Sequence, residues 1–298
     1  MERVEPDLSN ATSDRVRAVR ALSQGSVRSR RGQFLAEGPQ AVREAVRFAA
    51  AQVRDVYLTV EAAQRYPEIT DAAQAAGLYS HLATPEVLAA MSADAQGVLA
   101  VLRHEDQQPG TPQLAGAQLV ALAHQVRDPG NAGTVIRAAD AAGADACVLT
   151  RGSVDVHNPK VVRSSVGSLF HLPVLTGTDL ATVLAAARDA GLQILAADGS
   201  GELDLDDLAD AAGRTAHPDD ALDATDAPDL ARPTLWIFGN EAHGLAPEDL
   251  DRADAVVQIP IHGYAESLNL AMAATICLYA SARAQRAARR QAHRAAHR

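Results

Sequence analysis

Short apolar runs alternate with amphipathic stretches through the second half of the chain. The runs that have the length of buried strands lie at 119–124, 146–150, 193–197, 235–238 and 255–261. Apolar residues at helical spacing predict helices over 131–142, 158–168 and 179–190, and a long last helix from about residue 267. Almost wholly apolar strands separated by helices are typical of a parallel sheet covered on both faces, so we expect an α/β fold.

A smaller α/β pattern occupies the first 105 residues. Ser13 can cap a helix that reaches about Gln24, and a basic turn from Arg28 to Gly38 runs into a short apolar segment. The other expected elements are helices at 39–49, 61–76 and from 84, and strands at 53–60 and 97–102. The polar stretch 104–113 separates the two patterns. We therefore predict domains at 1–105 and 116–285, joined by a linker at 106–115.

The distribution of charge changes what the net charge implies. The total of −10 argues against a nucleic-acid partner if it is spread evenly. However, residues 201–230 contain ten acidic residues and a single arginine, which predicts a mobile acidic insertion. Residues 1–54 contain ten arginines against six acids, and residues 281–298 contain six arginines and no acid. Arginine pairs well with phosphate, so RNA remains a candidate partner.

Two expectations remain open for the basic tail, residues 286–298. It can add phosphate contacts to an RNA, or it can be a disordered, solvated end.

Several classes of protein are excluded by features that the sequence lacks. No apolar run is long enough to cross a membrane, and the first residues do not resemble a signal peptide, so we expect a cytoplasmic protein. Cys147 and Cys277 lie in separate apolar runs, which favours buried thiols over a disulfide. No Cys or His spacing suits zinc, so we predict no metal site.

Three glycine-bearing segments follow predicted strands in the second domain. The segment 128–143 contains Asn131 and Arg137, the segment 238–245 reads FGNEAHGL and contains Glu241, and the segment 259–273 contains Ser267 and Asn269. Each is compatible by itself with an ordinary turn or helix cap. None matches a dinucleotide-binding or Walker motif, and Ser267 has no His and Asp partners that would support a hydrolase.

Taken together, the three segments resemble the motifs of the SpoU/TrmH-type branch of the SPOUT superfamily. The motifs NxGxxxR, FGNExxGL and IPI…ESLNLAMA occur in that order over roughly 119–285. Members are RNA 2'-O-ribose methyltransferases that use S-adenosylmethionine. The N-terminal RSRRGQFLAEGP is similar to the family's substrate-binding domain, which has an L30e-like fold. The resemblance implies a parallel-sheet domain with a deep trefoil knot, and a homodimer with the last helix at its interface.

The resemblance also implies roles for individual residues, carried over motif by motif. It assigns cofactor contacts to the segment 196–201 and to Ala197, Phe238, Gly239, Asn240, Gly244, Ile259, Ile261 and Leu268. It assigns catalytic roles to Asn131, Arg137, Glu241, Ser267 and Asn269, and RNA contacts to Arg28, Arg30, Arg31 and Ser165. Because arginine is a poor base, we expect Arg137 to orient a phosphate and stabilise the developing alkoxide, although a role as base stays open.

The expected function is therefore S-adenosylmethionine-dependent methylation of a ribose 2'-hydroxyl in RNA, with ribosomal RNA as the first candidate. Transfer RNA is the alternative substrate. A non-catalytic RNA-binding protein of ribosome assembly is the alternative of another class. The presence of Asn131, Arg137 and Glu241 favours an enzyme.

Overall fold

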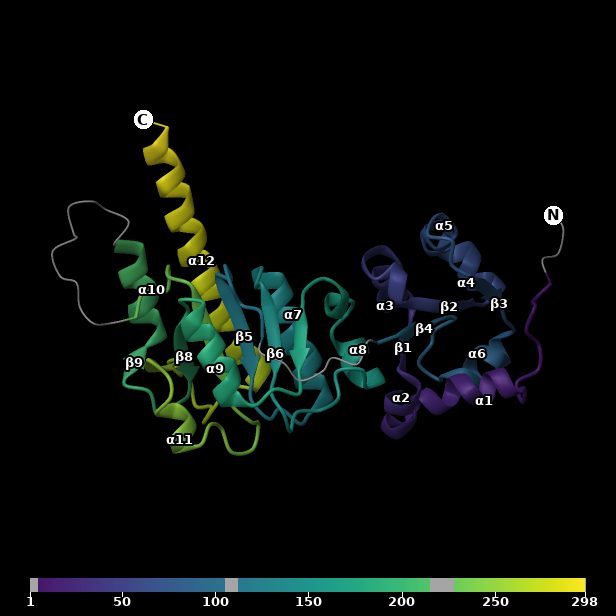
Figure 1. Cartoon of the computed structure of the whole chain (residues 1–298), viewed down its shortest axis with the longest axis horizontal. Coiled ribbons are helices and arrows are strands. Elements are labelled where there is room, and N and C mark those ends of the chain that lie inside the picture. The colour runs from purple at the N-terminus through teal and green to yellow at the C-terminus, as the bar shows by residue number, and fades with distance from the viewer. Residues whose placement is uncertain (1–4, 105–111, 215–227, 298) are drawn as a thin grey trace. The chain divides into compact units, whose positions relative to one another are not determined.

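A computed structural model describes residues 5–104, 112–214 and 228–297. The chain divides into two compact units, shown in Figure 1. Unit 1 comprises Met1–Gln107 and Asp155–His171, and unit 2 comprises Gln108–Val154 and Leu172–Arg298. The sequence predicted a single boundary near residue 105. Instead, the segment Asp155–His171, expected in the second domain, packs with the first unit.

Unit 1 is built on a four-stranded mixed sheet. The strand order is β1 (Gln33–Glu37), β4 (Val98–Arg103), β2 (Val53–Leu58), β3 (Ser80–Leu82), with β4 antiparallel to β1 and β2, and β3 parallel to β2. The helices are α1 (Asp14–Arg20), α2 (Gly25–Arg31), α3 (Pro39–Phe48), α4 (Val60–Arg65), α5 (Pro67–Ala75), α6 (Pro85–Met91) and α8 (Pro159–Ser164). Short 3₁₀ turns lie at Ala21–Ser23, Ala50–Gln52 and Ser168–Phe170.

Alternating side chains of this sheet form two hydrophobic cores. On β4, Val98 and Ala100 pack with α3 and α5, whereas Leu99 and Val101 pack with α1 and α6. Side chains of successive strand residues point to opposite faces, so a strand that is apolar throughout must be covered on both. Val162 of α8 joins the first of these cores, which explains why the returning segment belongs to unit 1.

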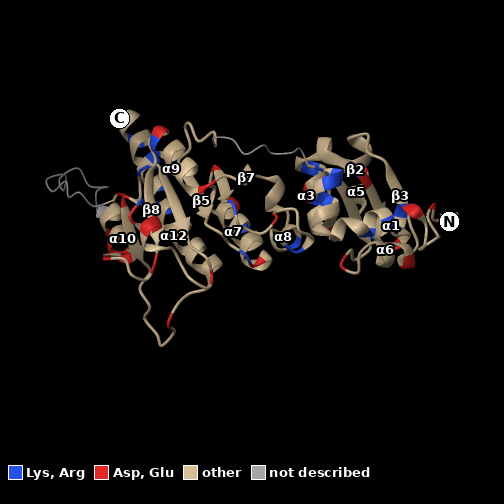
Figure 2. Cartoon of the chain, turned by 60° about the horizontal axis from the view of Figure 1, so that its bottom comes forward, with Lys and Arg blue, Asp and Glu red and all other residues tan. Residues whose placement is uncertain are grey.

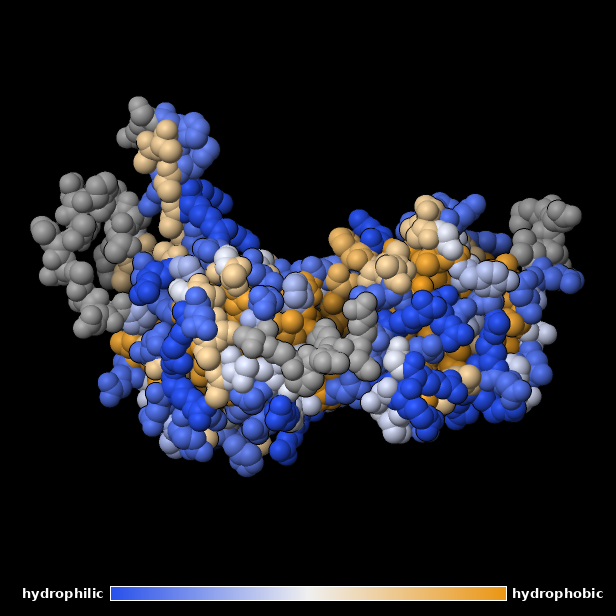
Figure 3. Space-filling view, in the orientation of Figure 1, coloured by the Kyte–Doolittle hydropathy of each residue, from blue (hydrophilic) through white to orange (hydrophobic). Residues whose placement is uncertain are grey.

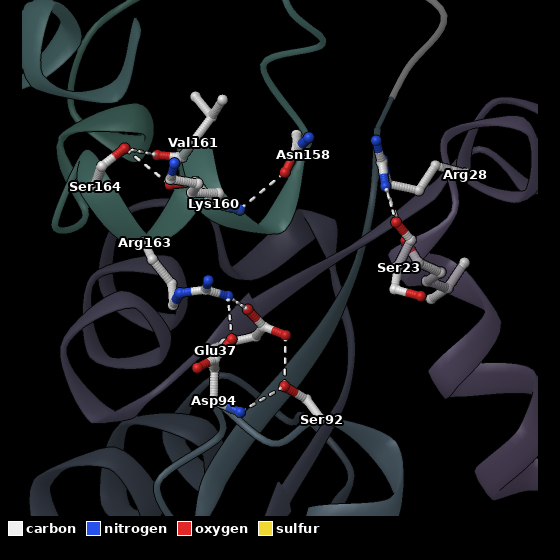
Figure 4. A network of polar contacts seen from close by, with 11 residues as sticks. Ser23, Arg28, Glu37, Ser92, Asp94, Asn158, Lys160, Val161, Arg163 and Ser164 are labelled. Carbon is white, nitrogen blue, oxygen red and sulfur yellow. Dashed lines mark hydrogen bonds and ion pairs between the residues drawn. The ribbon is translucent and has the colours of Figure 1, made fainter. Parts of the chain in front are cut away.

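An ion pair with a buried carboxylate holds the returning segment in place, as Figure 4 shows for Arg163 and Glu37. The carboxylate of Glu37 is almost completely buried, pairs with Arg163 and accepts a hydrogen bond from Ser92 Oγ at 2.6 Å. Arg163 also pairs with Asp94 at 3.0 Å. A buried carboxylate is costly unless it is paired and hydrogen-bonded, so these contacts are structural.

Unit 2 contains a seven-stranded sheet in which every pairing is parallel. The order is β7 (Val174–Thr176), β6 (Ala146–Leu149), β5 (Leu119–Ala123), β10 (Thr234–Phe238), β8 (Gln193–Ala197), β11 (Ala255–Gln258), β9 (Leu203–Asp204). Its helices are α7 (Pro129–Ala142), α9 (Leu180–Asp189), α10 (Leu205–Arg214), α11 (Pro247–Leu250) and α12 (Leu270–Ala296). This is the parallel α/β fold that the apolar runs predicted.

Helices cover both faces of the central strands. On one face, Val183 and Leu184 of α9 join a core with Leu122, Ile194 and Ile237. On the other face, α7 and α12 pack against each other and against the sheet, where Trp236 Nε1 donates to Ser281 Oγ at 2.9 Å. The register aligns Phe238 with Ala123 and with Ala197, so three central strands end at the same edge.

The acidic segment 201–230 is not a long loop throughout. Its first part forms β9, which adds a parallel strand beside β11, and then α10, where Leu205 and Leu208 are buried. Gly201 lies so close to β11 that a Cβ atom there would be 2.8 Å from Gln258 N. The predicted mobile insertion is therefore wrong for residues 201–214, and residues 215–227 lie outside the described part of the chain.

The last helix also differs from its prediction. It begins at Leu270 rather than near residue 267, because Asn269 caps it by accepting from Ala271 N at 2.9 Å. It then continues without a break to Ala296, so the predicted basic tail is helical as far as the structure describes it. A disordered end was one of the two expectations, and it is wrong for residues 286–296.

Candidate active site

A cavity of about 480 Å³ lies at the edge of the unit 2 sheet where β8 and β10 end. Its lining comes from all three glycine-bearing segments and from the loop after β8. The lining residues are Asn131, Ala197, Asp198, Gly199, Gly239, Asn240, Glu241, Gly244, Ile259, Ile261, Glu266, Ser267, Leu268, Asn269, Leu270 and Ala273. Ligands of parallel α/β sheets bind at this edge, beyond the carboxyl ends of the strands.

The structure brings most of the predicted site residues together in this cavity. Seven of the eight predicted cofactor residues line it, and Phe238 is the buried last residue of β10. Asn131, Glu241, Ser267 and Asn269 line it as well. Asp198 and Glu266 add two carboxylates that were not predicted individually as site residues, although Asp198 lies in the predicted cofactor segment 196–201.

The loop after β10 is closed on itself by two backbone hydrogen bonds. Asn240 N donates to Gly244 O, and Gly244 N donates to Asn240 O, both at 2.9 Å. Gly239 lies against this turn so closely that a Cβ atom there would be 2.4 Å from Gly244 C. Gly244 has a φ of +65°, a conformation that favours glycine. The two glycines are therefore needed for the shape of the loop, which presents main-chain groups to the cavity.

Three side chains from the three motifs form one continuous chain of hydrogen bonds. Asn269 Nδ2 donates to Asn131 Oδ1 at 2.9 Å, and Asn131 Nδ2 donates to Glu241 Oε1 at 3.2 Å. A carboxylate accepts only, and Asn269 Oδ1 is engaged by the first N–H groups of α12. The orientation of both amides is therefore fixed, and the three motifs are held in one geometry.

Glu241 is held at the start of α7 as well. Its two carboxylate oxygens accept from Asp128 N at 3.2 Å and from Arg127 N at 3.4 Å. The positive end of a helix dipole favours a carboxylate, and Asp128 caps the same helix by accepting from Asn131 N at 2.8 Å. The exposed Glu241 side chain is thus preorganised before any ligand binds.

The side chains that line the cavity restrict the kinds of ligand that can bind there. Asp198, Glu241 and Glu266 provide three carboxylates, and among the described residues that line the cavity none has a basic side chain. A phosphate-bearing cofactor would find no cation here, whereas a ligand with net positive charge is complemented. Ile259, Ile261 and Leu268 supply an apolar wall, and a volume of about 480 Å³ is typical of small-molecule sites. These features fit S-adenosylmethionine, with its sulfonium, its ammonium group and its adenine ring.

Arg137 does not line this cavity. It lies two turns into α7, exposed, beside a separate hollow formed by Thr134, Ala138, Ala141, Thr275 and Tyr279. Asn131 and Arg137 are six residues apart, a spacing that places them on different faces of a helix. The first motif therefore serves two different surfaces of unit 2.

Two of the predicted RNA contacts are wrong, because both side chains are buried in unit 1. Arg28 is 3% exposed and pairs with Asp155 at 2.5 Å. Ser165 is 0% exposed, and its hydroxyl donates to Val162 O at 2.8 Å. Arg30 and Arg31 are exposed at the end of α2, so their assignment to RNA stays a prediction.

Both cysteines are free and buried. Burial raises the pKa of the Cys147 thiol to about 12, so this thiol stays protonated and unreactive. Among the described residues, no group of three or more His, Cys, Asp or Glu side chains could hold a metal ion. No helix in the described part of the chain is long and apolar enough to cross a membrane.

Full-length relatives are similar to this chain over both units. An uncharacterised tRNA/rRNA methyltransferase of Synechocystis sp. is 31% identical, over 95% of this chain and 96% of the relative. A 23S rRNA guanosine 2'-O-methyltransferase of Bacillus subtilis is 29% identical, over 91% of this chain and 97% of the relative.

Solved structures support the same relationship. The AdoMet-bound rRNA methyltransferase from Sinorhizobium meliloti matches with a TM-score of 0.72 and 26% identity, over 93% of this chain and 97% of that one. A crystal structure described as an RNA 2'-O ribose methyltransferase matches with a TM-score of 0.74 and 26% identity, over 94% of this chain and 98% of that one. The SpoU rRNA Methylase family matches residues 118–279, which include all three motifs. This chain belongs to the SpoU rRNA methylase family.

Proposed function

We propose that this protein transfers a methyl group from S-adenosylmethionine to a ribose 2'-hydroxyl of ribosomal RNA. One observation carries the proposal: the three family motifs meet at a single cavity that has three carboxylates and no basic side chain among its described lining residues. The full-length relative from Bacillus subtilis, which covers both units, is named as an enzyme of 23S rRNA. With ribosomal RNA as substrate, the proposed location is the cytoplasm.

Side chains and main-chain groups of the cavity have distinct parts in holding the cofactor. Ile259, Ile261 and Leu268 provide an apolar wall for the adenine ring, and the turn at Gly239 and Gly244 exposes main-chain groups to the ribose. The carboxylates complement the positive charges of the cofactor. When bound, S-adenosylmethionine supplies an electrophilic methyl group on a sulfonium. We infer that the trefoil knot of the family shapes this region.

The ribose hydroxyl is a poor nucleophile, so the protein must take up its proton or stabilise the oxyanion. Glu241 is a carboxylate held by three donors and so stays fixed beside the cavity. Hydrogen bonds connect Glu241 through Asn131 to Asn269, which caps α12. Ser267 lies in the loop before that helix and also lines the cavity. We assign these four residues to ordering the target ribose.

Arg137 enters the reaction through a second copy of the chain. The face of α12 next to it carries Met272, Ile276 and Tyr279, which are 62%, 41% and 46% exposed and lie four and three residues apart. Three large apolar residues on one exposed helix face are typical of a protein interface. A homodimer through this face would bring Arg137 of one copy towards the cavity of the other. There its guanidinium orients a phosphate and stabilises the developing alkoxide.

Calorimetric titration with S-adenosylmethionine tests the cofactor, and methyl transfer to transcripts of 23S rRNA or to bulk tRNA tests the substrate. We expect saturable binding and incorporation into one ribose of the 23S transcript. Binding of S-adenosylmethionine without methyl transfer to any RNA would favour the non-catalytic alternative. Methyl transfer to tRNA alone would show that tRNA, and not ribosomal RNA, is the substrate.

A further inference from the structure

The C-terminal half of α12 has a row of arginines that neither the cavity nor the apolar face uses. Arg283, Arg286, Arg290 and Arg294 follow at intervals of three, four and four residues, the spacing that places side chains on one face of a helix. His293 and His297 add to this face. From Leu270 to Ala296 the helix contains no acidic residue. We call the row from Arg283 to Arg294 the arginine arm.

The arm is exposed and is not neutralised by the rest of the described chain. Gln285 is the last buried residue of α12, and beyond it the helix continues away from the sheet, as Figure 1 shows. Figure 2 shows basic residues gathered on this half of the helix, and Figure 3 shows hydrophilic surface along one side of it. Within the part of the chain that the structure describes, no arginine of the arm forms an ion pair with a carboxylate. Arg286 donates a hydrogen bond to the carbonyl oxygen of Ala142 at 3.1 Å.

The helix itself gives no reason for so many positive charges. Cations in the last turn are favoured by the helix dipole, which accounts for His293 and Arg294. That effect fades within one turn, so it does not account for Arg283 or Arg290. Like charges four residues apart, such as Arg290 and Arg294, repel one another and destabilise the free helix. A bound polyanion would remove this repulsion.

The geometry points to a nucleic-acid backbone as the partner. We propose that the arginine arm binds phosphates of the RNA substrate outside the target site, which rests on the proposed function. From Arg283 to Arg294 the row is roughly 16 Å long at 1.5 Å per residue, a length over which a nucleic-acid backbone presents many phosphates. The arm begins roughly 20 Å along α12 from Asn269, so only an RNA much larger than the target nucleotide could reach both.

Other partners fit the same surface less well. The side of the helix away from the row carries Ala284, Ala288, Gln291, Ala292 and Ala295, with no large apolar side chain. A helix that lies on a membrane needs bulky apolar residues opposite its basic face, and a helix that docks into a protein groove needs such anchors too. Phosphate binding requires neither. Contacts to phosphates do not depend on the RNA sequence. The arm therefore increases the affinity for RNA but does not select the nucleotide that is methylated.

Binding of a labelled 30-nucleotide RNA hairpin by the full chain, at several salt concentrations, tests the arm. The variant R283Q/R290Q/R294Q should lower the slope of log affinity against log salt by about 2 to 3, and weaken binding about 10-fold or more near 0.1 M salt. The variant R283K/R290K/R294K keeps the charges and should bind like the wild type. The double variant R188Q/R252Q removes charges elsewhere in unit 2 and should change the slope less.

A second readout does not depend on any variant's folding. Amide hydrogen exchange in residues 286–297 of the wild type should slow when the hairpin is added, since phosphates relieve the repulsion along the helix. Unchanged exchange there, an unchanged salt slope in the glutamine variant, or binding to phosphatidylserine vesicles but not to RNA would each overturn the proposal. All variants should retain affinity for S-adenosylmethionine. If RNA binding depends on the arm but no RNA is methylated, the proposal for the arginine arm is supported and the proposed methyltransferase function is wrong.

Discussion

Asn131 and Asn269 are 138 positions apart in the sequence, yet Asn269 Nδ2 donates to Asn131 Oδ1 at 2.9 Å. The first residue follows the cap of α7, and the second caps α12. Asn131 also donates to Glu241, which follows β10. This one amide therefore connects three segments that the sequence separates, and the geometry of the cavity depends on it.

Replacing Asn131 by alanine should impair methyl transfer more than folding. The substitution removes two hydrogen bonds between exposed side chains, each contributing about 0.5–1.5 kcal/mol, so turnover should fall roughly 10- to 100-fold. Turnover and cofactor affinity of purified protein measure the effect. Asn158→Ala, which removes an Asn cap from α8 in unit 1, is the matched control and should leave both unchanged. Equal effects of the two substitutions would contradict the role given to Asn131.

Gly239→Ala should weaken cofactor binding. The added Cβ would lie 2.4 Å from Gly244 C, a backbone atom, so the turn must shift at a cost of about 1–3 kcal/mol. A Cβ on Gly263, in the loop before α12, has no atom within 4 Å, so Gly263→Ala is the control. Calorimetric titration with S-adenosylmethionine should show a loss of roughly 10-fold or more for the first variant alone. Wild-type affinity in Gly239→Ala would show that the tight turn is not needed.

Arg137 should act across a subunit interface. Arg137→Ala homodimers should be inactive, and Asn131→Ala homodimers should keep roughly 1–10% of the wild-type activity. A heterodimer of the two, purified with two affinity tags, combines one intact cavity with one intact Arg137 and should recover about half of the wild-type activity. An inactive heterodimer would place Arg137 in the reaction of its own subunit, or outside the reaction.

His157 should make unit 1 sensitive to mild acid. Burial, with the charges of His104 and Arg28, lowers the pKa of His157 from 6.5 to about 4. The unfolded chain therefore binds more protons than the folded chain between these two pH values. The contribution of His157 to the free energy of unfolding is fully present above pH 6.5 and is lost as the pH decreases towards 4. The free energy of unfolding at pH 5 should therefore be lower than at pH 7.

The variant His157→Phe keeps a ring against Phe34 and His104, whose ring centroids lie 4.4 and 4.5 Å from that of His157. Urea unfolding at pH 7 and pH 5 should show a smaller difference for this variant than for the wild type. The same loss in both proteins would assign the acid sensitivity to other groups.

Much of unit 2 could be predicted because its central strands are buried on both faces. An apolar run such as 193–197 stands out in the sequence for that reason. The edge strand β9 could not be predicted, since it has two residues and lies among acidic ones. The helix α10 was missed for a related reason, because only Leu205 and Leu208 are buried and the acidic positions around them read as a solvated loop.

The sequence predicts which residues belong to the site, but it does not predict that Asn131 and Arg137 lie on two different surfaces of unit 2. The motifs identify Asn131 and Arg137 together, and only the helix geometry shows that they serve different faces. Arg28 and Ser165 resemble surface residues in a basic, polar stretch. Their burial depends on α8 returning to unit 1, a contact between positions about 130 residues apart that no local pattern encodes.

The central claim is that the cavity at the ends of β8 and β10 methylates a ribose of ribosomal RNA. Mapping 2'-O-methylation across the total RNA of the source organism, with and without the gene, tests this claim most directly. We predict that one ribose of 23S rRNA loses its methyl group without the gene, regains it with the wild-type gene, and regains it less completely with Asn131→Ala. An unchanged methylation pattern in all ribosomal RNA would contradict the claim.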